Sequence, residues 1–66
     1  MKQPEIKEKV MRFITRYRQV AEVSFICKAL NLKHGQVRKA LQSLRSEGVV
    51  IRTSKQYDKW VVKQLA

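Results

Sequence analysis

The stretch Val23–Val50, VSFICKALNLKHGQVRKALQSLRSEGVV, has the clearest structural pattern in the sequence. Apolar residues recur at helical spacing over two segments, about 24–30 and about 34–47, and a tight turn separates them. The buried stripe of the second segment follows the i, i+3, i+4, i+7 spacing at Val37, Ala40, Leu41 and Leu44. Gly48 predicts a left-handed stop for this second helix. The stretch therefore predicts a helix, a turn, a longer helix and the beginning of a strand.

The flanking segments complete the expected fold. A helix is expected over about 4–17, with an apolar face at Ile6, Val10, Phe13, Ile14 and Tyr17. A short extended piece is expected near 20–23, and Ser24 is expected to cap the next helix, whose inward residues would be Ile26, Ala29 and Leu30. Strands at about 49–53 and 60–63 are rich in β-branched and aromatic residues, and we expect them to pair as an antiparallel hairpin.

These elements predict a small α+β fold, a winged helix-turn-helix. Its three helices would precede a C-terminal β-wing of two or three strands at about 49–63, in a single domain over residues 1–66. Fifteen Lys and Arg oppose five Asp and Glu, and the formal net charge of +10 favours nucleic acid over a membrane as the partner. The single cysteine and the lack of an apolar signal sequence predict a cytoplasmic, nucleoid-associated protein.

The run ALNLKHGQVRKALQSLRSEGVV resembles the signature stretch of bacterial winged helix-turn-helix transcription regulators. The matching positions are Leu30, Leu32, Val37, Leu41, Leu44, Gly48, Val49 and Val50. The beginning of the second helix is similar to that of GntR-type regulators at His34, Gly35, Gln36 and Arg38. The short length and Trp60 look more like the small fimbrial-operon regulators of the FaeA type. The resemblance implies a DNA-binding regulator.

The Z-alpha domain is another winged helix with a tryptophan in its wing. That family has an asparagine and a tyrosine where this chain has Arg38 and Gln42. It also has a proline before the wing tryptophan, and no proline precedes Trp60 here. We therefore expect right-handed rather than left-handed DNA as the ligand.

Binding needs side chains that neutralise phosphates and side chains that read base edges. We predict base readout by residues on the exposed side and at the beginning of the second helix of the motif: His34, Gly35, Gln36, Arg38, Lys39 and Gln42. Glutamine can pair bidentately with adenine, and arginine with guanine. Contacts to the DNA backbone are predicted for Lys28, Lys33, Ser43, Arg52, Lys55, Tyr57 and Lys59. The alternative for each residue is a solvated side chain or, on the hairpin, protection of a strand edge by charge.

Trp60 and Cys27 are expected to be structural. We expect Trp60 to cover the core, with stacking on a base as the alternative, and Cys27 to be a small buried residue. One histidine and one cysteine do not make a usual zinc site. Neither a Gly-rich phosphate loop nor a Ser-His-Asp set is present, so we expect no metal, no cofactor and no enzyme activity.

The leading hypothesis is sequence-specific binding of double-stranded DNA in transcriptional regulation, with the second helix of the motif in the major groove and the basic wing on the backbone. One module of this size contacts few base pairs, so a homodimer or a larger regulatory protein is expected to add affinity. Two alternatives stay open: a protein-interaction adaptor that acts with a larger DNA-binding regulator, and an RNA-binding module.

Overall fold

The computed structural model describes residues 3–54 and 56–63. The elements in these ranges are α1 (Gln3–Tyr17), β1 (Ala21–Glu22), α2 (Val23–Leu30), α3 (His34–Ser46), β2 (Val50–Ser54) and β3 (Lys59–Val62). This order confirms the predicted winged helix-turn-helix class, and each helix begins and ends within a residue of its predicted bounds. None of the described helices is both long and apolar enough to cross a membrane.

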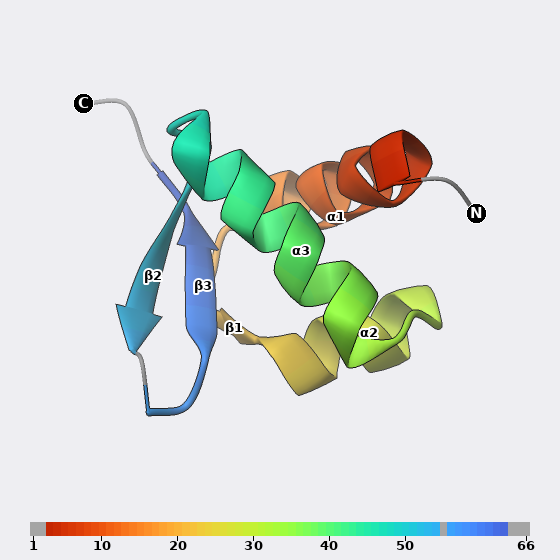
Figure 1. Cartoon of the computed structure of the whole chain (residues 1–66). Coiled ribbons are helices and arrows are strands. Elements are labelled where there is room, and N and C mark those ends of the chain that lie inside the picture. The colour runs from red at the N-terminus through yellow and green to blue at the C-terminus, as the bar shows by residue number, and fades with distance from the viewer. Residues whose placement is uncertain (1–2, 55, 64–66) are drawn as a thin grey trace.

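The helices and the sheet pack around α3, which lies in front of α1 in Figure 1. The beginning of α3 lies beside α2, and its last turns lead through Gly48 into β2. The described strands form one antiparallel sheet in the order β1-β3-β2. The predicted hairpin is therefore present as β2 and β3. The short extended piece before α2 forms β1, which pairs with the free edge of β3.

Apolar side chains from every element meet in one core. Its buried members are Ile6, Val10, Ile14, Ala21, Val23, Ile26, Cys27, Val37, Ala40, Leu41, Leu44, Val50 and Trp60. The predicted stripe of α3 is fully buried, and Trp60 and Cys27 lie in the core as expected. Burial of this stripe fixes which side of α3 faces outward, because helical neighbours three and four residues apart share one face.

The expected cap of α2 is wrong. Ser24 lies inside the helix, which begins at Val23 after an extended Glu22 that makes no side-chain capping bond. The amide of Val23 instead donates to the carbonyl oxygen of Asp58 at 3.2 Å. A helix needs hydrogen-bond acceptors for its first free N–H groups. The carbonyl oxygen of Asp58, in the wing loop, accepts from one of them, which is the role predicted for the serine hydroxyl.

Two side chains predicted to point into the core lie at the surface. Tyr17, at the end of α1, and Ala29, on α2, are both exposed. The helix α2 buries Val23, Ile26 and Cys27, so its inward stripe is rotated towards the beginning of the helix and Ala29 turns away. Both exposed residues face the outer junction of α1 and α2.

We predict that Gly48→Ala lowers the free energy of unfolding by about 1–2 kcal/mol. Gly48 has a φ of 77°, a region that L-residues with a Cβ adopt at a cost. No described atom lies within 4 Å of the added Cβ, so the loss would come from the backbone alone. Urea unfolding followed by circular dichroism measures it.

Gly35→Ala is the matched control. Gly35 lies within α3, and an added Cβ likewise meets no described atom within 4 Å. Alanine there should leave stability unchanged or raise it by up to about 1 kcal/mol. Equal losses in the two variants would contradict the left-handed stop.

Candidate nucleic-acid interface

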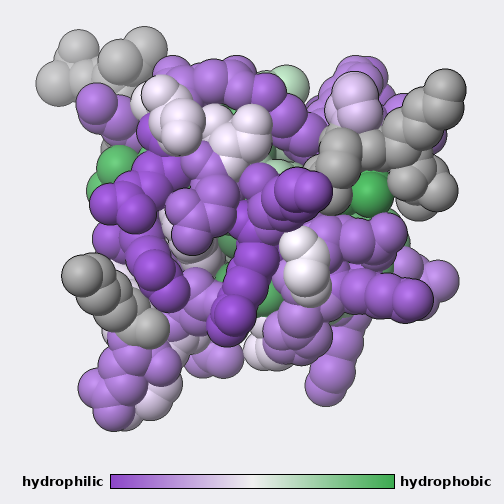
Figure 2. Space-filling view, viewed as in Figure 1, coloured by the Kyte–Doolittle hydropathy of each residue, from purple (hydrophilic) through white to green (hydrophobic). Residues whose placement is uncertain are grey.

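The outward side of α3 and the adjacent wing form a hydrophilic face. Figure 2, seen as Figure 1, shows polar side chains over most of the coloured surface and few apolar ones. The residues opposite the buried stripe of α3 are Gly35, Lys39, Gln42 and Ser46, and all four are exposed. Arg38 lies on the side of α3 that faces the wing, whereas Ser43 lies on the side that faces α1.

Most of the predicted readers are accessible. Those on α3 that are exposed are His34, Gly35, Arg38, Lys39 and Gln42, and Gln36 is half-buried. Among the predicted backbone contacts, the exposed ones are Lys28, Lys33 and Tyr57, and the half-buried ones are Ser43, Arg52 and Lys59. Lys55 lies outside the described residues. These placements bring the α3 readers together on one surface, while Lys28 lies apart on α2.

Gln36 has a structural role that the sequence reasoning missed. Its Oε1 accepts a hydrogen bond from the backbone N–H of Lys33 at 3.0 Å, at the beginning of α3. This bond satisfies an N–H at the helix start and matches one half of a capping box. A bidentate contact from Gln36 to adenine would have to share the carbonyl oxygen with that N–H or give up the bond, so the capping bond restricts the orientation of its amide.

Asp58 joins the wing to α3. Its Oδ2 accepts from Nε of Arg38 at 2.8 Å. Its Oδ1 accepts from Nη2 of Arg52 at 2.9 Å and from Nε1 of Trp60 at 3.1 Å. Together with the bond from the Val23 amide to its carbonyl oxygen, this residue connects α2, α3, β2 and β3. We call Arg38, Arg52, Asp58 and Trp60 the Asp58 cluster.

The local backbone explains how the Asp58 cluster forms. Arg52 and Trp60 are directly opposite each other on β2 and β3, so their side chains share a face of the sheet. The guanidinium of Arg52 lies 5.5 Å from the centroid of the Trp60 ring, a cation–π distance. Asp58 has a φ of 52°, a left-handed conformation that Asp and Asn tolerate better than most residues. The turn places its carboxylate over the pair.

Burial and charge act in opposite directions on the Asp58 carboxyl. Burial alone would raise its pKa, but hydrogen bonds from Arg38 and Trp60, together with the charges of Arg38 and Arg52, lower the pKa below its ordinary value. The ionised form is therefore favoured in the folded protein. A single negative charge is held between two arginines, in a surface that is otherwise strongly basic.

The two arginines of the cluster differ in how freely they could bind a ligand. The side chain of Arg52 is 24% exposed and that of Arg38 is 60% exposed, against 13% for Asp58. Exposed ion pairs contribute about 0–1 kcal/mol, so Arg38 can exchange partners cheaply. Arg52 is held by the carboxylate and by Trp60, and this structural role was not predicted from its position on the wing.

Ion pairs also engage acidic residues elsewhere. Glu47, just after α3, pairs with Lys7 of α1, and Glu8 pairs with Arg12 one turn later on α1. Lys39 and Lys33 make no ion pair within residues 3–54 and 56–63. The cationic side chains of the α3 face thus remain available to an external anion.

The same face shows no sign of a metal centre. No group of three or more His, Cys, Asp or Glu is arranged to hold a metal ion in the described part of the chain. Cys27 is buried, and burial raises the pKa of its thiol, which disfavours the reactive thiolate.

Asp58 is the site residue that sequence reasoning missed. It is the only aspartate in the chain and stands two residues before Trp60. A single aspartate among basic residues of a hairpin could have been used to predict an ion pair at this position. The link to Arg38, 20 positions earlier, is a tertiary contact that no local pattern contains.

Comparison with known proteins supports the fold. No protein-family profile matches the chain, and no curated protein matches it in sequence. Its fold is similar to the crystal structure of the Zalpha domain from Carassius auratus PKZ in complex with Z-DNA, with a TM-score of 0.80 and 18% sequence identity. The match covers 92% of this chain and 97% of that chain. At this identity the similarity establishes a shared winged-helix fold, and the GntR-type and FaeA-type resemblances remain predictions.

We predict that Asp58→Asn lowers the free energy of unfolding by about 1–3 kcal/mol at neutral pH, because the charged acceptor of two arginines is removed. Asparagine keeps the left-handed backbone. Because the folded-state pKa of Asp58 is lowered, its stabilisation is complete above the unfolded value of about 3.9 and is lost as the pH falls through the folded value.

The measurement is urea unfolding of the wild type and Asp58→Asn at neutral pH and at about pH 2.5. The difference between the two proteins should shrink in acid. Glu22→Gln, on the exposed part of β1, is the control and should change stability by less than about 0.5 kcal/mol. A difference for Asp58→Asn that stays constant with pH would contradict a role for its charge.

Proposed function

We propose that this protein binds double-stranded DNA, with α3 in the major groove and the wing on the adjacent backbone. The observation that carries the proposal is the polar, basic outer face of α3 beside the wing, on a fold that another protein uses in a complex with DNA. An α-helix fits the width of the major groove. The buried stripe of α3 directs Gly35, Lys39 and Gln42 outward, where a groove would meet them.

Electrostatics supports a nucleic acid as the ligand. A formal net charge of +10 on 66 residues attracts a phosphate backbone from a distance, and each neutralised phosphate releases counterions. Lys33 and Lys39 provide cationic groups around the beginning of α3, and His34 adds an imidazole that can donate a hydrogen bond. Tyr57, exposed near the tip of the wing, carries a hydroxyl suited to a phosphate oxygen. Affinity from these contacts should depend strongly on salt.

Arg38 is the best candidate for base readout. Among the described residues, Asp58 engages only its Nε, which leaves the two terminal nitrogens free to pair with guanine O6 and N7. A guanidinium held at Nε loses less rotamer freedom when it binds. If Arg38 left Asp58, the carboxylate would still be held by Arg52 and Trp60. Asp58 would thus act as a positioning residue for Arg38.

Left-handed DNA is a second candidate, supported by the fold match to a domain solved with Z-DNA. Against it stand Arg38 and Gln42, where that family has asparagine and tyrosine. Trp60 is buried and donates to Asp58, so its ring is not open to a base. We therefore favour right-handed duplex DNA, and a role in transcriptional regulation together with a second copy or a larger regulator.

Titration by fluorescence anisotropy would test the ligand class. The probes are a random-sequence DNA duplex, a chemically locked left-handed CG repeat, duplex RNA and single-stranded DNA, each at two salt concentrations. We expect salt-sensitive binding that is tightest for the right-handed duplex. Tighter binding of the CG repeat would select the second candidate, and preference for RNA would contradict both.

We assign Lys39, which was predicted to read a base, a phosphate contact, so Lys39→Ala should weaken duplex binding and reduce the salt slope by about 0.9, the value of one phosphate contact. Lys9→Ala is the matched control, because Lys9 is also an exposed helical lysine but lies on α1, away from the proposed interface. Its slope should stay close to that of the wild type. Equal effects of the two changes would show that general charge, not α3, carries the binding.

Arg38→Ala should remove about 1–3 kcal/mol of discrimination between a duplex obtained by binding-site selection and one altered at its guanines. Arg38→Lys keeps the charge but loses the fork, so it should lose the same preference while retaining most of the affinity for random duplex. Asp58→Asn should weaken the preference in part. If Arg38→Ala still prefers the selected duplex over the altered one to the same degree, Arg38 does not read a base.

A further inference from the structure

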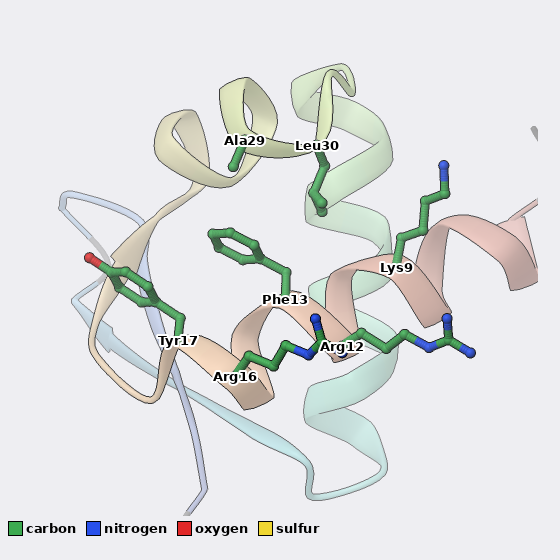
Figure 3. Close-up of a pocket in the computed structure, with 7 residues that line it drawn as sticks. All are labelled: Lys9, Arg12, Phe13, Arg16, Tyr17, Ala29 and Leu30. Carbon is green, nitrogen blue, oxygen red and sulfur yellow. The ribbon is translucent and has the colours of Figure 1, made fainter.

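A second surface lies at the outer junction of α1 and α2. Figure 3 shows Phe13 pointing from α1 towards α2, with Ala29 and Leu30 pointing back from α2. Together with Tyr17 and three cationic side chains, they line an open groove of about 650 Å³. In Figure 3 α1 lies in front of α3, whereas in Figure 1 α3 lies in front of α1. This α1/α2 groove therefore opens on the side away from the proposed DNA interface.

Aromatic rings form one wall of the α1/α2 groove. The rings of Phe13 and Tyr17 stack, with centroids 5.7 Å apart and an angle of 9° between their planes. Phe25 does not line the groove itself, but its ring supports this wall by packing against both, at 5.8 Å and 5.2 Å. Its side chain is nevertheless 44% exposed. An aromatic cluster left open to solvent forgoes part of the stabilisation that burial would give it, and exposed apolar patches of this kind commonly mark interaction sites.

Cationic side chains form the opposite rim. Lys9, Arg12 and Arg16 recur on one side of α1, at the spacing that places helical residues on a shared face. Arg12 pairs with Glu8, whereas Lys9 and Arg16 make no ion pair in the described ranges. The groove thus offers apolar contacts along its floor and unneutralised positive charge along its edge.

We infer that the α1/α2 groove binds an acidic amphipathic helix from a partner protein. Leucine or phenylalanine side chains of that helix would enter between Phe13, Tyr17 and Leu30, as in other complexes of a helix in a groove. Its Asp and Glu residues would meet Lys9 and Arg16, which complements the charge of the rim and steers association. This inference is independent of the proposed DNA binding, because it uses other residues on another face.

Two other occupants fit less well. A second copy of this chain would bring another charge of +10 onto a rim that is already basic, and like charges oppose such an interface. A nucleic acid strand would need a free aromatic face for each base, but Phe13 and Tyr17 already stack on each other and Phe25 is tilted against both. The aliphatic side chains of Ala29 and Leu30 favour an apolar anchor.

The test uses the full chain and a labelled helical peptide of about 14 residues, with leucines at i, i+3, i+4 and i+7 and Asp or Glu elsewhere. Anisotropy should show binding that weakens with salt, whereas a scrambled peptide of the same composition should bind at least about tenfold more weakly. Phe25→Ala and Arg16→Glu should each weaken binding of the patterned peptide by about tenfold.

Each variant has a matched control. Ile51→Ala removes a side chain that is 45% exposed on β2, close to the 44% of Phe25. Arg45→Glu reverses an exposed charge on α3 that is not part of the groove. Both controls should bind the peptide like the wild type, and circular dichroism should show all four variants folded. Phe25→Ala should leave duplex DNA binding unchanged.

Three results would overturn the inference. The first is equal affinity for the patterned and scrambled peptides. The second is peptide binding that Ile51→Ala weakens as much as Phe25→Ala. The third is binding of single-stranded DNA that Phe25→Ala abolishes and that added peptide does not affect. That result would assign the groove to nucleic acid instead.

Discussion

One carboxylate joins the wing to α3 by direct hydrogen bonds. Asp58 accepts hydrogen bonds from Arg38 of α3, Arg52 of β2 and Trp60 of β3, and its carbonyl oxygen receives the first amide of α2. The described core is small, and Trp60 and Val50 are the residues of the hairpin that are buried in it. The polar cluster adds the directional restraint that the core cannot supply.

The Asp58 cluster also reduces the electrostatic repulsion between two neighbouring arginines on a basic surface. Two arginines close together repel each other, and the repulsion is offset here because both donate to a shared anion. The better exposed arginine stays accessible while the other, over the Trp60 ring, becomes structural. Asp58 thereby gives two similar side chains different roles: Arg38 remains available to a ligand, and Arg52 supports the fold.

Much of the fold could be predicted from local patterns. The stripe of α3, the left-handed Gly48 and the β-branched strands each depend on residues close in sequence, and each lies where it was expected. The cap of α2 could not be predicted, because its partner comes from the wing. The outward face of α3 followed from its buried stripe, but the second roles of Gln36 and Arg52 arise from contacts made only after the chain folds.

The position of the α1/α2 groove has a consequence for thermodynamic linkage. It opens on the side of the molecule away from the outer face of α3, so ligands on the two faces do not compete for space. Occupation of one site would then leave the other free and hold both ligands within one molecular diameter. The effective concentration of one ligand near the other would then be set by the dimensions of the folded protein rather than by the length of a flexible linker. A chain this small could thus act as a rigid tether between two larger molecules.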